Sequence, residues 1–402
     1  MRLFIRRRMT MYSLLVIIYL AFVSLGLPDS LLGASWPIMH QEIGIPLSFM
    51  GVITFVISMG TVLSSLFSYK LIQRFGTGKI TTISVFMTAI ALLGFSYSQN
   101  LIMIFIFSIP YGFGAGAIDA ALNNYVATHY SSKHMSWLHC FWGVGTVISP
   151  FIMSYALTYW NWSGGYRIIS IIQMLIGLVL LLSLKLWKSN EKANEIENNN
   201  DSSSENLGLI QTLKIKGVPS LLIGFFAYCS AEATVMAWSA TYLVKAKNID
   251  EATAAAFASM FFIGMTVGRF FGGFIMDKFG DRRMILIGTI IIFSGVALML
   301  IPTNNHIFSL LGLIIIGLGC APIYPCIVHS TPYNFGEKNS GAIIGIQMAS
   351  AYLGATVMSP LYGVIGDNIG FSSMPIYVLL FAILMIIMIE NTFKNSDSTC
   401  EK

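Results

Sequence analysis

Twelve long apolar stretches, separated by short polar breaks, constrain what this chain can fold into. A helix needs about 20 apolar residues to cross the hydrocarbon core of a bilayer. Because the stretches are continuous rather than alternating in polarity, they predict helices and not the strands of a β-barrel. The sequence therefore predicts an all-α membrane protein with twelve transmembrane helices, at 11–38, 47–72, 79–97, 101–128, 135–158, 164–187, 217–245, 252–277, 283–301, 306–330, 339–366 and 370–391.

Composition excludes the soluble classes of protein. Only 10% of the 402 residues are charged, against about 25% in soluble domains. The net charge of +5 comes from basic residues at the ends of the apolar stretches, so nucleic acid is not an expected partner. The five cysteines are irregularly spaced and predict no disulfide framework. No P-loop, HExxH or paired CxxC motif occurs, so we expect no cofactor, no metal and no enzymatic activity.

A polar segment at 189–206 divides the chain into two halves of six predicted helices each. The predicted domains are an N-terminal bundle at 1–188, a cytoplasmic linker at 189–216 and a C-terminal bundle at 217–402. Basic residues gather at the breaks on one side of the predicted membrane, which indicates the cytoplasmic side. We therefore expect a multi-pass protein of the cell (plasma or inner) membrane, with both termini in the cytoplasm.

The two halves repeat each other. TVISP at 146–150 recurs as TVMSP at 356–360, an offset of 210, and segment 69–78 resembles segment 273–282, an offset of 204. Offsets near half the chain length predict two parallel halves around an axis along the membrane normal, with a binding site between them.

The second copy of this repeat carries the sharpest motif, GGFIMDKFGDRR at 272–283. With twelve predicted helices, it resembles the signature loop of the major facilitator superfamily. In this loop we expect Gly273, Gly280 and Arg282 to shape the turn, and Asp277 to meet a neighbouring helix end or a basic side chain and so lock one conformation. In the first copy Gln73 takes the place of the aspartate.

Other segments narrow the resemblance: GLPDSLLGASWP at 26–37, GFGAGAIDAALNNYVA at 112–127, YCSAEATVMAWSATYL at 228–243 and GLGCAPIYP at 317–325. Together they resemble the fucose permease branch, the sugar–proton symporters. The resemblance implies that an acid in the first helix and one in the fourth serve substrate binding and proton coupling; here these are Asp29 and Asp119.

Three acids lie inside apolar stretches, whereas nearly all the others lie at polar breaks: Asp29, Asp119 and Glu232. A charge at the centre of a membrane helix costs about 2.5–3.5 kcal/mol on insertion scales. No basic partner within the membrane is evident for these acids, so we expect them to line a watery cavity or to carry protons. The alternative is a structural hydrogen bond to a neighbouring helix.

Amides, a histidine and aromatic residues in the same helices are candidate solute contacts. Asn123 lies one helical turn after Asp119 on the same face. His139 is expected at a similar depth, where an Asp–His pair could relay protons. Trp36 is expected in the interfacial aromatic belt rather than at the site. The candidate substrate-binding residues are Asn123, Asn124, His139, Trp142, Gln173, Trp238, Tyr324, Gln347 and Tyr352; for each, packing or interhelical hydrogen bonding is the alternative.

These features predict a monomeric secondary active transporter. Its partners are protons, a small polar solute, for which a monosaccharide is the leading candidate, and the lipid bilayer. The predicted mechanism is proton-coupled symport by alternating access. The alternative is a proton-driven efflux antiporter for drugs or metabolites, because GVGTVISP at 143–150 partly matches the antiporter glycine–proline pattern.

Overall fold

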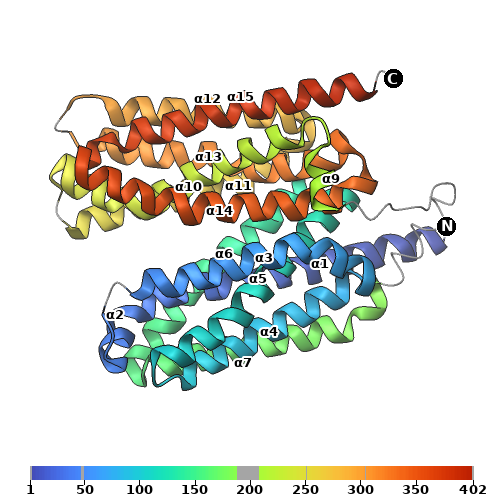
Figure 1. Cartoon of the computed structure of the whole chain (residues 1–402), viewed down its shortest axis with the longest axis horizontal. Coiled ribbons are helices and arrows are strands. Elements are labelled where there is room, and N and C mark those ends of the chain that lie inside the picture. The colour runs from blue at the N-terminus through green and yellow to red at the C-terminus, as the bar shows by residue number, and fades with distance from the viewer. Residues whose placement is uncertain (1, 47–48, 188–207, 250, 304, 401–402) are drawn as a thin grey trace. The chain divides into compact units, whose positions relative to one another are not determined.

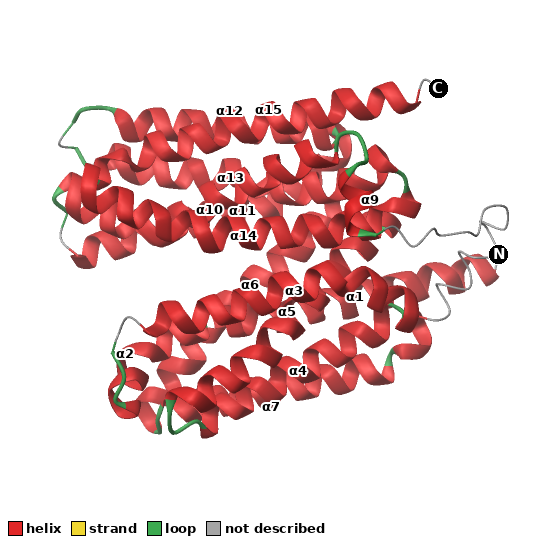
Figure 2. Cartoon of the chain, viewed as in Figure 1, coloured by secondary structure: helices red, strands yellow, loops and turns green. Residues whose placement is uncertain are grey.

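The computed structural model describes residues 2–46, 49–187, 208–249, 251–303 and 305–400. Within these ranges the chain forms helices and no strands (Figures 1 and 2). The elements are α1 (Arg2–Asp29), α2 (Leu31–Ile43), α3 (Phe49–Phe75), α4 (Thr77–Tyr97), α5 (Leu101–His129), α6 (Ser132–Tyr159), α7 (Trp162–Leu182), α9 (Leu209–Leu213), α10 (Val218–Lys247), α11 (Glu251–Phe279), α12 (Asp281–Leu300), α13 (Ile307–Phe335), α14 (Glu337–Ile369), η1 (Phe371–Ser373) and α15 (Met374–Cys400).

The prediction of twelve membrane-crossing helices is confirmed: twelve spans in the described residues are long and apolar enough to cross a bilayer. The first span differs from the expected single helix. It breaks between α1 and α2 at Ser30, two residues after Pro28, and Asp29 lies at the break. The segment predicted as a linker, 189–206, lies outside the described residues, and α9 forms directly after it.

The chain folds as two compact units. Unit 1 comprises Met1–Tyr125 with Phe141–Asn206, and unit 2 comprises Val126–Cys140 with Leu207–Lys402. Unit 2 thus includes the end of α5, the α5–α6 turn and the start of α6, although these residues lie in the first half of the sequence. Within unit 2, α10 to α15 lie side by side along a common direction (Figure 1). The predicted domain boundary at 189–216 remains a prediction.

The repeated turn keeps its backbone in both halves. Gly76 precedes α4 with φ 83° and ψ 154°, and Gly280 precedes α12 with φ 75° and ψ 159°. These positive φ values favour glycine, because a Cβ is strained there. The two positions are 280 − 76 = 204 residues apart, the offset of the sequence repeat. The repeat therefore fixes the same helix–glycine–helix junction twice.

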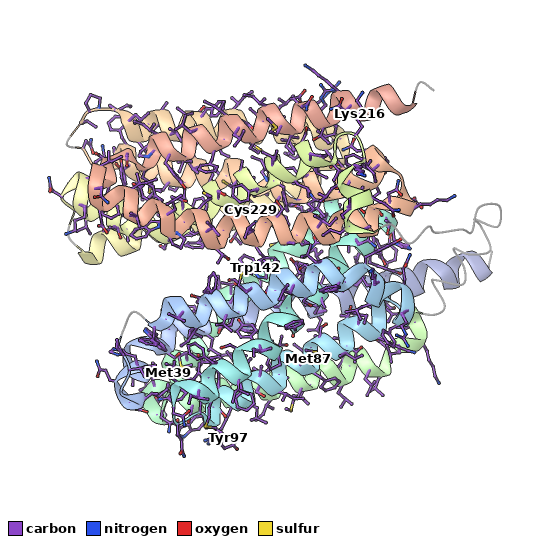
Figure 3. The ribbon with its side chains drawn as sticks, viewed as in Figure 1. Met39, Met87, Tyr97, Trp142, Lys216 and Cys229 are labelled. Atoms are coloured by element: carbon purple, nitrogen blue, oxygen red, sulfur yellow. The ribbon has the colours of Figure 1, made fainter. Side chains whose placement is uncertain are left out.

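Unit 1 has a core of apolar side chains from its helices near one end of the bundle. Trp36 is 2% exposed and packs in this cluster with Met39, Phe95 and Tyr166. Figure 3 shows Met39 near one end of unit 1. Because Trp36 is buried among protein side chains, its expected place in the lipid-facing aromatic belt is wrong.

Candidate functional site

The site in unit 1 lies beside backbone carbonyls that lack their usual helix hydrogen bond because a proline follows four residues later. Pro28 lacks an N–H, so it cannot bond the carbonyl of Ser24 four residues earlier in α1. Gln173 of α7 donates from Nε2 to that oxygen at 2.6 Å. Gln173, a predicted solute contact, is fully buried. Its hydrogen bond to Ser24 gives it a structural role, which is to join α7 to α1.

The same device recurs in α6. Pro150 releases the carbonyl of Thr146, and Ser30, at the break between α1 and α2, donates its hydroxyl to that oxygen at 2.7 Å. A buried polar group without a partner is costly in the membrane. The prolines therefore specify which side chains join α1 to α6 and to α7.

Close helix packing supports this junction. A Cβ at Gly145 of α6 would lie 2.3 Å from the Val23 carbonyl oxygen of α1, and one at Gly26 would lie 2.1 Å from that of Trp142. Only glycine leaves room for backbones this close. The glycine contact sets Trp142 beside the end of α1.

Asp29 receives hydrogen bonds from two aromatic side chains. Trp142 of α6 donates from Nε1 to Oδ2 at 2.7 Å, and the Tyr111 hydroxyl of α5 donates to Oδ1 at 3.4 Å. Asp29 remains solvent-accessible, and Trp142 is partly exposed. Figure 3 shows Trp142 partway along the bundle, away from the end that holds Met39. The carboxylate is thus oriented and still reachable.

Asp119 of α5 is buried and lies within electrostatic range of Asp29. Asn123, one turn later, donates from Nδ2 to the Asp119 carboxylate at 2.7 Å and to its carbonyl oxygen at 2.9 Å. The prediction that both lie on one helix face is confirmed. Asn124 is partly buried. The structure therefore brings together Asp29, Asp119, Asn123 and Trp142 within unit 1.

Unit 2 contains the third acid, and here the sequence expectation is wrong. Glu232 of α10 does have a basic partner in the membrane: Arg269 of α11 lies 3.3 Å from its Oε1. The Tyr228 hydroxyl, one turn before Glu232, donates to the same oxygen at 2.9 Å. The Arg269 and Glu232 side chains are only 5% and 13% exposed. The acid is therefore part of a buried ion pair.

Two predicted solute contacts meet beside this pair. The rings of His139 and Tyr324 pack edge to face with centroids 4.5 Å apart, and His139 lies within electrostatic range of Arg269. The Tyr324 ring also packs against Phe225 at 4.8 Å. His139 belongs to unit 2 and Asp119 to unit 1, so the predicted Asp–His relay remains a prediction.

Two other candidates in unit 2, Trp238 and Gln347, contact neighbouring helices. Trp238 donates from Nε1 to the Ser359 carbonyl at 2.8 Å and stacks on Phe371. Gln347 is fully buried and accepts from the Thr331 hydroxyl at 3.0 Å. Trp238 and Gln347 thus connect α14 to α10 and to α13. Tyr352 lies partly buried on α14.

In the signature loop, Asp277 meets a helix end. Its carboxylate accepts from the Ser131 hydroxyl at 3.0 Å and from the backbone N–H of Lys133 at 3.1 Å, at the first turn of α6. A carboxylate there is favoured by the unpaired N–H groups and the positive end of the helix dipole.

The remaining loop residues shape the same corner of unit 2. A Cβ at Gly273 would lie 2.5 Å from Nε1 of Trp137. Arg282 holds Glu390 of α15 through two hydrogen bonds, of 2.6 and 3.2 Å. The first-half copy has no such carboxylate: its Gln73 donates to the Tyr69 hydroxyl instead.

Sequence reasoning missed four residues that the structure brings to these sites: Arg269, Tyr111, Tyr228 and His329. Two signals were present. Arg269 lies inside an apolar stretch, and Tyr228 precedes Glu232 by four residues, which places both on one helix face. The partners of Tyr111 and His329 are distant in sequence. Among the described residues, no group of three or more His, Cys, Asp or Glu side chains could hold a metal ion.

Twelve spans, a repeated turn and ionisable side chains within the membrane define a class: multi-pass transporters made of two repeated halves. Residues 18–248 and 220–398 match the Major Facilitator Superfamily, and the chain belongs to that superfamily. It is a transporter and not an enzyme.

Relatives with curated descriptions are distant. The chain is 21% identical over 388 residues to bypass of stop codon protein 6 of Saccharomyces cerevisiae, covering 88% of this chain and 77% of that one. It is 23% identical over 202 residues to the proton-coupled antiporter flippase LtaA of Staphylococcus haemolyticus, covering half of each.

Solved structures share the fold. FucP in the outward conformation superimposes with a TM-score of 0.76 at 15% identity, over 94% of this chain and 98% of that one. FucP is the fucose:proton symporter of E. coli. The proton:xylose symporter XylE, bound to 6-bromo-6-deoxy-D-glucose, superimposes with a TM-score of 0.80 at 12% identity, over 96% of each chain. At these identities the likeness extends to the fold alone.

Proposed function

We propose that this protein is a secondary active transporter that moves a small polar solute, a monosaccharide, together with protons by alternating access. The observation that carries the proposal is the pair of carboxylates in unit 1. Asp29 and Asp119 lie in membrane spans within electrostatic range of each other, and Asp29 is reachable. Two nearby carboxylates repel when both are ionised. Uptake of one proton removes that repulsion, so the pair is suited to proton coupling.

The neighbours of the pair support a hydroxyl-rich solute. Trp142 offers an aromatic face partway along the bundle, and Asn123 and Asn124 offer amides one turn from Asp119. A ring face can pack on the apolar face of a sugar, and amides exchange hydrogen bonds with hydroxyls. The proposal also includes further solute-binding residues. They are Gln173 in unit 1 and His139, Tyr324, Gln347, Trp238 and Tyr352 in unit 2.

Glu232 remains a proposed proton-coupling acid, but its ion pair changes what proton uptake there requires. Its ion pair with Arg269 rests on one contact of 3.3 Å. A proton on Glu232 would cancel its charge, and the buried Arg269 would lose this ionic interaction. Proton uptake at Glu232 is therefore coupled to a rearrangement around Arg269.

The proposal places the protein in the cell membrane as a monomer with both termini in the cytoplasm. The supporting observation is the excess of Lys and Arg at one set of span ends, including Lys70, Arg74, Lys278 and Arg283. Positive charge near span ends favours the cytoplasmic side.

Uptake into proteoliposomes tests the function. Labelled monosaccharides, beginning with L-fucose and D-xylose, are offered with an imposed pH gradient, alkaline inside. A gradient of one pH unit stores about 1.4 kcal/mol, enough for about tenfold accumulation at one proton per solute. We expect a protonophore to abolish accumulation. Asp29→Asn and Asp119→Asn should also abolish it, whereas Asp367→Asn, at the exposed end of α14, should accumulate normally.

Two results would contradict the proposal: accumulation that ignores the gradient, or normal coupling in both Asp29→Asn and Asp119→Asn. The efflux alternative is favoured by the GVGTVISP segment in α6. The same vesicles separate the two, because an antiporter moves a labelled hydrophobic cation against the direction of proton flow and leaves sugars outside.

A further inference from the structure

Unit 2 contains a second cluster of ionisable groups, which includes a residue of the signature loop but none of the acids proposed for proton coupling. Four residues form it: Tyr130 and Ser132 at the α5–α6 turn, Asp281 at the start of α12, and His329 in α13. We call it the histidine clasp. The His329 and Asp281 side chains are 6% and 11% exposed, so bulk water offers them few alternative partners.

The number of hydrogen atoms that the clasp needs can be counted from its contacts. Nε2 of His329 lies 3.0 Å from the carbonyl oxygen of Tyr130, which only accepts. Nδ1 lies 2.6 Å from Oδ2 of Asp281, and the Ser132 hydroxyl lies 2.5 Å from Oδ1. Each contact needs one hydrogen. A neutral histidine supplies one and the serine supplies one.

The third hydrogen must come from an added proton, on either His329 or Asp281. Without it, a lone pair of the imidazole faces an acceptor oxygen at one of its two contacts. Ser132 cannot compensate, because its single hydrogen can serve either Oδ1 of Asp281 or Nδ1 of His329, which lies 2.9 Å from the Ser132 hydroxyl, but not both. The closed clasp therefore holds one proton more than a neutral histidine beside a carboxylate.

Titratable groups on neighbouring elements, within the described residues, also face the clasp. Asp277 of α11 lies within electrostatic range of His329 but is engaged at the first turn of α6. Tyr333 and Cys326, on the same helix as His329, approach the His329 ring and Asp281 respectively. Burial raises the pKa of the Tyr130 phenol to about 12, so this group stays protonated over the physiological range.

We propose that the histidine clasp is a proton-binding site that fastens the α5–α6 turn to α12 and α13 when occupied and releases it when empty. The ligand is the proton itself. Because only the closed clasp holds the extra proton, low pH favours closure and rising pH favours release. Through the clasp, proton occupancy controls the freedom of residues 126–140, independently of the acids proposed for coupling.

Hydrogen exchange of the full-length protein in nanodiscs, without solute, tests the proposal. Amide protection of residues 130–136 is followed from about pH 5 to about pH 9, which includes the range in which histidine ordinarily changes charge. The rates are corrected with an unstructured peptide of the same sequence. Above the midpoint we expect protection to fall about tenfold per pH unit, because opening releases one proton.

Matched variants isolate the clasp. Asp281→Asn and His329→Gln should lose the dependence on pH. In the first an amide N–H can meet Nδ1 without an added proton, and in the second the imidazole is absent. Asp277→Asn should lower protection at every pH and keep the fall. His306→Gln, at the exposed far end of α13, should match the wild type. Constant wild-type protection, or a fall that persists in both Asp281→Asn and His329→Gln, would overturn the proposal. The outcome does not depend on any transport assay.

Discussion

At the scale of single residues, aromatic side chains provide hydrogen-bond donors for two acids inside the membrane. Asp29 is bonded by Trp142 and Tyr111, and Glu232 by Tyr228. An indole or phenol combines an apolar body with one polar donor, so it can solvate a carboxylate without adding a charge. Glu232 also forms an ion pair with the buried Arg269.

The ion pair predicts a pattern of stability in a double-mutant cycle. Arg269→Gln and Glu232→Gln should each destabilise the protein by about 3–5 kcal/mol, because each removes one partner of a buried ion pair. The double variant should recover most of that loss, since it contains neither charge. Thermal unfolding in detergent measures the effect, with Arg283→Gln, at an exposed position, as the control. Additive losses in the double variant would show that the two side chains do not depend on each other.

At the scale of helices, prolines determine how α1 is held. Pro28 frees the Ser24 carbonyl for Gln173, and Pro150 frees the Thr146 carbonyl for Ser30. Such carbonyls must find other donors in the membrane. Glycine contacts between α1 and α6 bring these donors within reach. The position of Asp29 at the helix break follows from this joint.

A second double-mutant cycle tests whether Gln173 serves the Ser24 carbonyl that Pro28 leaves without a backbone donor. Gln173→Leu should destabilise the protein by about 1–3 kcal/mol, because the buried Ser24 carbonyl loses its donor. With Pro28→Ala present, the new backbone N–H can bond that carbonyl, so the same substitution should cost clearly less. Chemical or thermal unfolding of the four proteins gives the coupling energy. If Gln173→Leu costs the same in both backgrounds, the carbonyl is not what Gln173 serves.

At the scale of the whole molecule, the proposed topology of twelve crossings puts both chain ends on one side of the membrane, because twelve is an even number. The proposal takes this side to be the cytoplasm, since positive charge gathers at the span ends there. Cys400 follows the last span, and the other cysteines lie within spans. A membrane-impermeant maleimide should therefore label Cys400 in inside-out vesicles and not in right-side-out ones.

Two substitutions complete the topology experiment. Cys400→Ser should remove the label. Adding Ser202→Cys to that variant should restore it in inside-out vesicles, because the proposed topology puts the segment between the sixth and seventh spans on the side of the termini. Labelling in right-side-out vesicles would reverse the proposed orientation.

The sequence by itself determined the twelve helices, the repeated halves and the superfamily. Helices in lipid must satisfy their own backbone, so a run of apolar residues specifies one with little help from its neighbours. The Asp119–Asn123 pair was predictable for the same local reason, since residues four apart share a helix face. The repeated turn at Gly76 and Gly280 was also local.

Tertiary structure alone decided which helix supplies each partner. Arg269 is 37 residues from Glu232, Trp142 is 113 from Asp29, and His329 is 197 from Ser132. No periodicity reports such contacts, because they depend on how helices pack and turn toward one another. The ion pair, the joint between α1 and α6 and the histidine clasp arise from that packing, where a buried polar group must find a partner from another helix.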